Sequence, residues 1–374
     1  MEIDFSTPLP VFPPDFRSGF ASLVGRPNAG KSTLTNALVG QKVAITSNRP
    51  QTTRHTIRGI VHKDDYQLIL VDTPGIHRPR TLLGERLNDL VAGTLSQVDV
   101  LGFCIPADEK IGPGDRYIAS QLVASSNKPV VAIVTKADKV NAEQLSEQLL
   151  AVAALGEEVM SAERAARAKR AEHRAKQRAA GKKVKYEKPV AFAKDSGPAA
   201  QRDSGRDIEE PMPNDGKGGW AAIIPVSAVQ FFQVEAVADL LSQYIPLSPP
   251  LYPEGELTDE PEETLIAELV REAALEGARD ELPHSIAVTV DEMDYRPGRP
   301  KDKPLLDVHV SLYVERESQK AIVIGKGGQN LRKIGMRARA QMEALLGERI
   351  FLDIHVKIAK EWQSDPRALN RLGF

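Results

Sequence analysis

The chain has 374 residues, which is long enough for two or three domains. Hydrophobic residues make up 41% and charged residues 27%, a composition typical of a globular protein rather than of a fibrous or membrane-spanning one. The formal net charge of −2 argues against a uniformly basic nucleic-acid binder. The charge is uneven, however, because residues 316–374 hold twelve Lys and Arg against six Asp and Glu. This basic C-terminal part is suited to a polyanionic partner.

The single cysteine and the N-terminus bear on the compartment. Cys104 lies in an apolar run and cannot form a disulfide within the chain, which indicates a reducing compartment. We interpret it as a small core hydrophobe, with a reactive thiol as the alternative. Residues 1–17 lack the features of a signal peptide and are predicted to be an irregular tail. No run approaches the roughly 20 apolar residues that span a membrane. We expect a cytoplasmic protein and leave peripheral membrane contact open.

Between residues 18 and 248, short apolar runs alternate with helical stretches. Residues 31–40 are predicted to begin a helix. Five apolar runs are predicted strands: 19–25, 66–75, 98–106, 128–138 and 220–228. Strands that alternate with helices predict right-handed βαβ units and a mostly parallel sheet covered on both faces, which is an α/β fold.

Residues 157–219 interrupt this pattern. Their first half is rich in Ala and charge without an apolar stripe, and the second half is rich in Gly, Pro and Asp. Such a segment buries too little apolar surface to offset its ordering entropy, so we predict an insertion that is partly solvated helix and partly disordered. A passive loop is one interpretation. An auxiliary RNA-binding arm is the other, because the first half is strongly basic.

A Pro-rich acidic linker at 249–261 precedes a second domain at 262–374. Apolar residues have helical spacing at Leu265, Leu269 and Ala273. Strand-like alternation follows at 286–290, 308–314 and 350–358. The order helix, strand, strand, helix pair, strand predicts a three-stranded α+β domain.

Residues 25–32 read GRPNAGKS and match the phosphate-loop pattern G-x-x-x-x-G-K-[ST] between a predicted strand and a helix. Lys31 is predicted to reach the β- and γ-phosphates during catalysis, and Ser32 to bind Mg²⁺. An ordinary Gly-rich turn is the alternative. The candidate nucleotide-binding residues of this loop are Gly25, Arg26, Pro27, Asn28, Ala29, Gly30, Lys31, Ser32 and Thr33.

A second motif ends the strand at 66–75. Asp72 is predicted to hold Mg²⁺, and the Gly75 N–H to contact the γ-phosphate during catalysis. Between the two motifs lies QTTRH, residues 51–55, where Thr53 is the predicted third Mg²⁺ ligand and Thr52 its alternative. No side chain in this motif can orient the attacking water, since Ile76 follows Gly75, so we predict slow intrinsic hydrolysis that RNA or a bound ion assists. The candidate residues of this motif are Asp72, Thr73, Pro74, Gly75 and Ile76.

A third motif follows the predicted strand at 128–138. Asp138 can accept hydrogen bonds from N1–H and the exocyclic amine of guanine, a donor pair that adenine lacks, and this predicts selection of GTP. The stem of Lys136 can pack on the purine, and backbone N–H groups near Ser227 can reach the guanine carbonyl. The candidates here are Thr135, Lys136, Ala137, Asp138, Val226, Ser227 and Ala228.

A glycine-rich turn in the second domain predicts an RNA site. A G-x-x-G turn that begins a basic helix brings backbone close to a sugar-phosphate chain, while an apolar groove beside it holds bases. A structural helix connector is the alternative. The predicted RNA-binding residues are Gly325, Lys326, Gly327, Gly328, Arg332 and Lys333, with Arg337 and Arg339 nearby.

Together these residues resemble the Era family of bacterial ribosome-assembly GTPases, within the TrmE-Era-EngA-like group. GRPNAGKS, QTTRH, DTPG and VSA stand in the family's order, residues 314–335 resemble its KH core, and Trp362 to Gly373 match its closing pattern. The resemblance covers 18–156 and 220–374. It implies a P-loop GTPase domain and a type II KH domain, with GTP or GDP and Mg²⁺ as ligands. It also implies binding to the 3′ end of small-subunit ribosomal RNA and to the immature small subunit in ribosome biogenesis.

The resemblance implies further properties and has two departures. Family members are cytoplasmic and partly associate with the inner membrane face, and we expect a monomer. Asn28 matches the residue with which related GTPases hold K⁺. Thr135 stands where the family usually has Asn, which predicts weaker guanine binding, and the 157–219 insertion is absent from the usual pattern. The alternatives are an RNA-binding adaptor with little hydrolysis, and a related GTPase of tRNA modification or large-subunit assembly.

Overall fold

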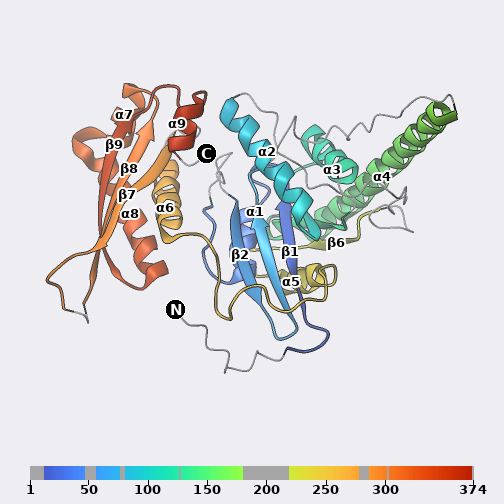
Figure 1. The fold of residues 1–374 in the computed structure, drawn as a ribbon, viewed down its shortest axis with the longest axis horizontal. Helices are drawn as coiled ribbons and strands as arrows, with labels where there is room; N and C mark the ends of the chain where they lie inside the picture. The colour runs from blue at the N-terminus through green and yellow to red at the C-terminus, as the bar shows by residue number, and fades with distance from the viewer. Residues whose placement is uncertain are drawn as a thin grey trace.

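The computed structural model describes residues 12–46, 56–75, 81–125, 128–179, 219–277, 286–300 and 303–372. Within these ranges the chain forms two sheets, one of six strands and one of three, each with its own helices (Figure 1).

The first domain contains the six-stranded sheet. Its strands are β1 (Arg17–Val24), β2 (Ile57–His62), β3 (Tyr66–Asp72), β4 (Val100–Pro106), β5 (Val130–Thr135) and β6 (Ala222–Pro225). Its helices are α1 (Lys31–Val39), α2 (Leu82–Gln97), α3 (Pro113–Ser125), the 3-10 turn η1 (Ala137–Lys139), α4 (Ala142–Ala179) and α5 (Val234–Ser242).

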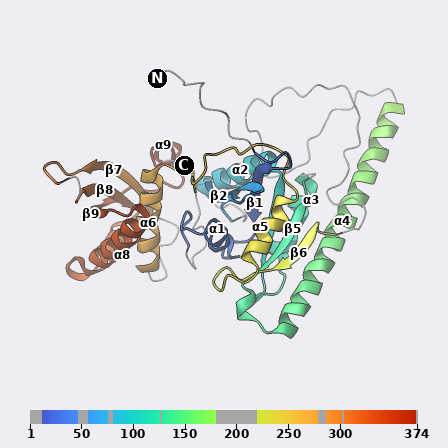
Figure 2. The same cartoon turned by 90° about the horizontal axis from the view of Figure 1, so that it is seen from below.

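The strand order is β2-β3-β1-β4-β5-β6, and all neighbours are parallel except the antiparallel pair β2 and β3. The helices α1 and α5 cover one face, while α2, α3 and α4 cover the other (Figure 2). Both faces of the sheet are therefore covered by helices and shielded from water, which explains why β3, β4 and β5 are apolar almost throughout. The predicted mostly parallel α/β sheet is confirmed.

The sequence prediction missed β2. Its apolar run is short and is interrupted by Arg58 and Gly59. Gly59 lies under α1, since a Cβ there would come within 2.6 Å of the Val39 side chain. The outer edge of β2 is paired in part with the chain leading to the second domain, because Ile60 N donates to the backbone oxygen of Leu257 at 2.9 Å. Residues of the predicted linker are thus packed on the first domain, and this pairing protects a sheet edge.

Helix α4 continues from the first domain into the predicted insertion. Val152, Leu155 and Met160 pack into the core on the face of the six-stranded sheet that α2 and α3 also cover. Glu163 is the last buried residue of the helix among the side chains described, which extend to His173. Residues 180–218 lie outside the described residues. Among the described helices, none is long and apolar enough to cross a membrane.

The second domain has the element order that the sequence predicts. It consists of α6 (Glu262–Gly277), β7 (Ala287–Tyr295), β8 (Leu305–Val314), α7 (Glu317–Ile324), η2 (Lys326–Gly328), α8 (Gln329–Leu346), β9 (Arg349–Ile358) and α9 (Pro366–Arg371). In the sheet, β8 is antiparallel to β7 and parallel to β9. The helices α6 and α8 pack on one face through Val270, Ala273 and Ile334. The predicted α+β domain is confirmed.

The two domains touch along α2 and along α6. Leu83 and Leu87 of α2 share an apolar cluster with Trp362 and Leu369, and α9 lies beside α2 in Figure 1. Leu83 N also donates to the backbone oxygen of Gln363 at 3.1 Å. At the second contact, the buried Glu272 of α6 forms an ion pair with Lys42 of the first domain.

Candidate functional site

The phosphate loop, residues 25–32, joins the end of β1 to the start of α1. Asn28 and Gly30 have left-handed backbones, with φ of 63° and 83°. Gly25 lies against β4, because a Cβ there would stand 2.6 Å from the backbone oxygen of Cys104. The loop is a close turn of backbone at a helix N-terminus, which is the arrangement that binds phosphate groups.

The side chain of Lys31 folds back across this loop. Its Nζ donates hydrogen bonds to the backbone oxygens of Gly25 at 3.2 Å and Arg26 at 3.0 Å. Lys31 is only 6% exposed. Burial lowers the pKa of its ammonium, and the Asp72 carboxylate partly opposes that effect. An anion beside a buried ammonium stabilises its charge, so the position suits a phosphate group.

The predicted metal ligands Ser32 and Asp72 lie side by side. Ser32 Oγ donates to Asp72 Oδ2 at 2.7 Å, and Asp72 is fully buried at the end of β3. Hydroxyl, carboxylate and water oxygens are the ligands that Mg²⁺ prefers, so this pair fits the ion. Thr53 and its alternative Thr52 lie outside the described residues, as does Ile76.

Gly75 approaches the phosphate loop closely. A Cβ on Gly75 would lie 2.8 Å from the backbone nitrogen of Pro27, so a side chain there does not fit without movement. The Thr73 hydroxyl donates to the backbone oxygen of Leu23 at 3.2 Å. This bond fastens the 72–75 segment, which includes Pro74, to β1.

Five of the seven predicted base-reading residues, all but Ala137 and Ser227, line a pocket of about 260 Å³ beside the phosphate loop. Ser227 Oγ donates to Asp138 Oδ1 at 2.6 Å and so orients the carboxylate. Ala137 N donates to the backbone oxygen of Val226 at 3.1 Å, which joins the two loops that form the pocket. The lining residues include Asn28, Gly30, Thr33, Thr135, Lys136, Asp138, Val226 and Ala228.

Thr135 connects this pocket to the phosphate loop. The residue is 3% exposed, and its Oγ1 donates to the backbone oxygen of Ala29 at 2.7 Å. Lys136, the next residue, has a left-handed backbone with φ of 57°. The resemblance leads one to expect Asn at this position. The shorter Thr135 side chain instead binds the phosphate loop through its hydroxyl.

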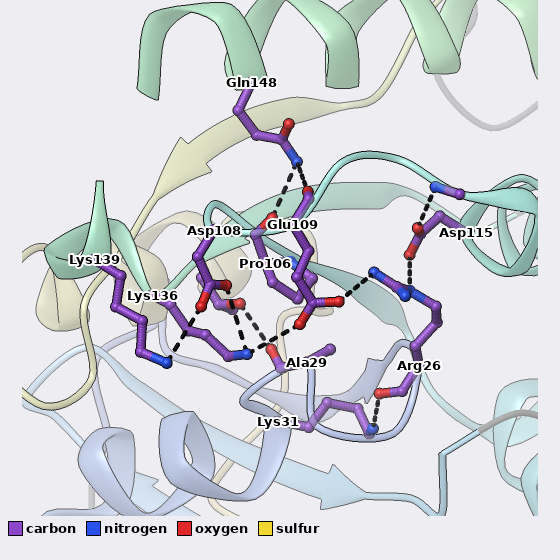
Figure 3. A network of polar contacts seen from close by, with 12 residues as sticks. Arg26, Ala29, Lys31, Pro106, Asp108, Glu109, Asp115, Lys136, Lys139 and Gln148 are labelled. Atoms are coloured by element: carbon purple, nitrogen blue, oxygen red, sulfur yellow. Dashed lines mark hydrogen bonds and ion pairs between the residues drawn. The ribbon is translucent and has the colours of Figure 1, made fainter. Parts of the chain in front are cut away.

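Acidic residues after β4 form ion pairs with the phosphate loop and with the loop that follows β5, and sequence reasoning missed them (Figure 3). Arg26 is bound to the buried Asp115 at 2.6 Å and to Glu109 at 3.1 Å. Glu109 also lies 3.5 Å from Lys136 Nζ, so one carboxylate contacts both loops. Asp108 adds ion pairs to Lys136 and to the neighbouring lysine of η1. Their spacing in the sequence gives no signal, because the partners are distant in the chain.

The predicted RNA loop lies between α7 and α8. Gly325, Gly327 and Gly328 all have positive φ, between 58° and 77°. A Cβ on Gly325 would lie 2.7 Å from that of Asn330, so the turn requires glycine there. Beside it runs a groove of about 580 Å³, lined by Gly328, Leu331, Arg332, Gly335, Met336, Arg339, Leu352, Asp353 and Ile354.

The predicted RNA-binding cations differ in placement. Lys326, Arg332 and Lys333 are exposed beside the turn. Arg337 instead forms an ion pair with Glu276 of α6 at 2.6 Å. The groove thus combines glycine backbone, apolar side chains such as the 61% exposed Met336, and exposed positive charge at its rim. This combination suits single-stranded RNA.

Known proteins share both domains. A family model described as a 50S ribosome-binding GTPase matches residues 20–136, and a KH-domain model matches residues 281–363. The GTPase Era of Streptomyces coelicolor is 55% identical over 358 residues, which cover 96% of this chain and 95% of that protein. The chain belongs to the Era family of GTPases. The GTPase Era of Mycobacterium avium is 54% identical, in an alignment that covers 96% of this chain and 99% of that protein.

Solved Era structures have the same fold. A variant of Aquifex aeolicus Era bound to GDP and AlF4⁻ aligns with a TM-score of 0.74 and 29% identity, over 96% of this chain and 99% of that one. A second Era structure, with MgGDPNP and nucleotides 1506–1542 of 16S ribosomal RNA, aligns equally well. The fold is therefore that of a P-loop GTPase domain followed by a KH domain, as the resemblance implied. GTP or GDP and Mg²⁺ are its cofactors.

Proposed function

We propose that this Era-family GTPase is a switch protein that binds small-subunit ribosomal RNA near its 3′ end and acts in rRNA processing and assembly of the small subunit. One observation supports this most. A phosphate loop with the buried Lys31 and a KH groove of about 580 Å³ stand in one chain that matches Era proteins over almost its whole length. A related Era structure holds the 3′ part of 16S rRNA.

In the proposed reaction, water attacks the γ-phosphorus of GTP and the bond to the β-phosphate oxygen breaks. Lys31 exchanges the backbone oxygens of Gly25 and Arg26 for phosphate oxygens, and the Gly75 N–H contacts the γ-phosphate. Ser32, Asp72 and Thr53 would hold Mg²⁺, which would supply charge that offsets the charge developing on the transferred group. Asp138, oriented by Ser227, accepts from the guanine edge.

We infer slow intrinsic hydrolysis, because Ile76 occupies the position after Gly75 and carries no polar group. RNA or a bound cation then assists the reaction. Asn28, whose backbone in the phosphate loop has a left-handed conformation, is the residue proposed to hold K⁺. Faster single-turnover hydrolysis in KCl than in NaCl is expected, and equal rates contradict the K⁺ proposal.

Both segments that sense the γ-phosphate border contacts with the KH domain, and this supports a switch. Residues 47–55 follow Thr46, whose backbone N and Oγ1 donate to Glu272 Oε1 at 2.8 and 3.2 Å. Residues 76–80 precede α2, where Leu83 binds the backbone of Gln363. GTP that engages these segments therefore alters how the KH domain is held. By linkage, RNA must then favour the GTP state by the same free energy.

RNA affinity and hydrolysis test the proposal together. We expect RNA from the 3′ end of 16S rRNA to bind more tightly with a GTP analogue than with GDP, and to accelerate single-turnover hydrolysis. The control is Lys31→Ala, which removes the response to nucleotide while leaving the KH groove intact. RNA affinity that is the same with GTP analogue, GDP and no nucleotide contradicts the switch.

The same measurement separates the second candidate, an RNA-binding adaptor with little hydrolysis. Ile76 favours that candidate, and hydrolysis that stays slow when RNA is bound would support it. The proposal also includes a cytoplasmic monomer with peripheral contact to the inner membrane face, and this membrane contact follows from the resemblance alone. Liposome flotation tests the membrane contact, and protein that stays unbound contradicts it.

A further inference from the structure

Helix α4 extends beyond the domain that carries it. It has 38 residues, which at about 1.5 Å per residue gives roughly 57 Å. Its first half packs through Val152, Leu155 and Met160. None of the side chains described from Arg164 to His173 is buried. Figures 1 and 2 both show this end of α4 projecting on the side opposite the KH domain.

The projecting part carries dense positive charge. Residues 164–179 hold seven Lys and Arg and one Glu, a formal charge of +6. Because the whole chain carries −2, the remaining residues together carry −8. A basic segment on an otherwise acidic chain produces a local positive potential that attracts polyanions.

The composition of this segment indicates what it can bind. Residues 161–179 contain no Val, Leu, Ile, Met or aromatic Phe, Tyr or Trp, and their only apolar side chains are those of Ala, so the helix has no large apolar side chain to pack on a protein or to enter a membrane interface. Ala, Arg, Lys and Gln favour the helix intrinsically. Glu163 adds ion pairs to Arg167 and Arg170, both at 3.1 Å, where the segment leaves the domain. The helix therefore carries cations along its length without a large apolar anchor, which suits phosphate groups.

We propose that residues 164–179 of α4, the basic arm, form a second RNA-binding surface that contacts the phosphate backbone of a large folded RNA. The inference rests on the proposed RNA binding by the KH domain. The arm and the KH domain lie on opposite sides of the GTPase domain. A short RNA in the KH groove therefore does not reach the arm, whereas ribosomal RNA in the small subunit spans both. Two linked contacts raise the affinity for the subunit without any change in the KH groove.

Neutralising the arm tests this directly. In the full chain, Arg164, Arg167, Lys169 and Arg170 are changed together to Gln, which keeps helix propensity. The matched control replaces the three arginines by Lys and so preserves the charge. Binding to purified small ribosomal subunits, and to a short oligonucleotide of the 16S 3′ end, is measured over a series of KCl concentrations. Far-UV circular dichroism confirms equal helix content.

For subunits, the Gln variant should reduce the slope of log K against log salt by about 3, since each phosphate contact contributes roughly 0.7 to 0.9. Its affinity for subunits should fall at least about tenfold at low salt, and the Lys variant should bind like the unmodified chain. Oligonucleotide binding should be the same for all three proteins.

Three results would contradict, in turn, the arm as a binding surface, the proposed function of the KH domain, and RNA as the partner of the arm. Equal subunit binding by the unmodified chain and the Gln variant overturns the proposal that the basic arm binds RNA, and it leaves the proposal for the KH domain intact. An unmodified chain that fails to bind the oligonucleotide contradicts the proposed function instead. Should the Gln variant lose binding to phosphatidylserine vesicles but keep subunit binding, the partner is an anionic membrane surface and the RNA assignment is wrong.

Discussion

Changing Glu272 to Gln should weaken the coupling between GTP and RNA. Glu272 belongs to α6 of the KH domain and is 1% exposed, yet the contacts of its carboxylate are on the GTPase domain. It forms an ion pair with Lys42 and accepts two hydrogen bonds from Thr46, at 2.8 and 3.2 Å. Gln keeps the shape and one accepting oxygen but removes the charge at the border of residues 47–55.

The size of the effect follows from these contacts. A hydrogen bond to a charged group contributes roughly 1.5–3 kcal/mol and one between neutral groups roughly 0.5–1.5, so the loss at Thr46 is about 1 kcal/mol. The Lys42 side chain is 33% exposed, so solvent screens the ion pair to no more than about 1 kcal/mol. The sum of about 1–2 kcal/mol corresponds to roughly 5- to 30-fold in an equilibrium constant. This range is the upper bound on the change in coupling.

The assay is fluorescence anisotropy of a labelled 16S 3′-end RNA with a GTP analogue and with GDP. The ratio of the two dissociation constants should move toward one in Glu272→Gln. Glu276→Gln is the matched control, because Glu276 lies one turn further along α6 and pairs with Arg337 inside the KH domain. A ratio that stays unchanged in Glu272→Gln would refute the role of this contact.

Three further predictions concern the nucleotide domain. In Gly75→Ala, the new Cβ would lie 2.8 Å from Pro27 N, so the proposed N–H contact to the γ-phosphate would be displaced. Loss of a hydrogen bond to a charged group, roughly 1.5–3 kcal/mol, should slow single-turnover hydrolysis about tenfold to hundredfold while GDP affinity holds; unchanged hydrolysis contradicts this. In Thr135→Val, the backbone oxygen of Ala29 loses its donor. Thermal unfolding should show a loss of about 1–3 kcal/mol that Thr135→Ser does not share, and equal melting of all three proteins argues against it. Burial raises the pKa of the Cys104 thiol from 9.0 to about 12. Between these values the folded chain keeps a proton that the unfolded chain has lost, so this thiol lowers stability by about 1.4 kcal/mol per pH unit as pH rises. Cys104→Ala should remove that part of the slope in denaturant titrations, and parallel curves for the two proteins disagree with the assignment.

Local patterns in the sequence predicted most of the fold. Strict alternation at Val308, Val310, Leu312 and Val314 placed all four side chains on one face of β8, and all four are buried. The apolar runs of β3, β4 and β5 indicated strands covered on both faces. These signals are readable because each depends on residues adjacent in the chain, where a period of two or a continuous run reports burial directly.

What the sequence left hidden depends on distant residues. Strand β2 is buried because α1 crosses Gly59 and because Leu257 pairs with its edge, and neither partner is near in sequence. The Lys42–Glu272 pair joins residues 230 positions apart. No local period records such contacts.

Thr135 shows how a substitution in a motif is read differently with a structure. Its place in the motif, where the family usually has Asn, predicted only weaker guanine binding. The structure adds that the hydroxyl binds the backbone of Ala29, a contact that a pattern of residue types does not contain.

Recognition of guanosine triphosphate by this one site is the claim on which the rest depends. Isothermal titration calorimetry of the full chain with Mg²⁺, comparing GTP with ATP, tests it most directly. We predict that GTP binds and that ATP, which lacks the donor pair for Asp138, binds far more weakly. Equal uptake of both nucleotides, or uptake of neither, would contradict the account.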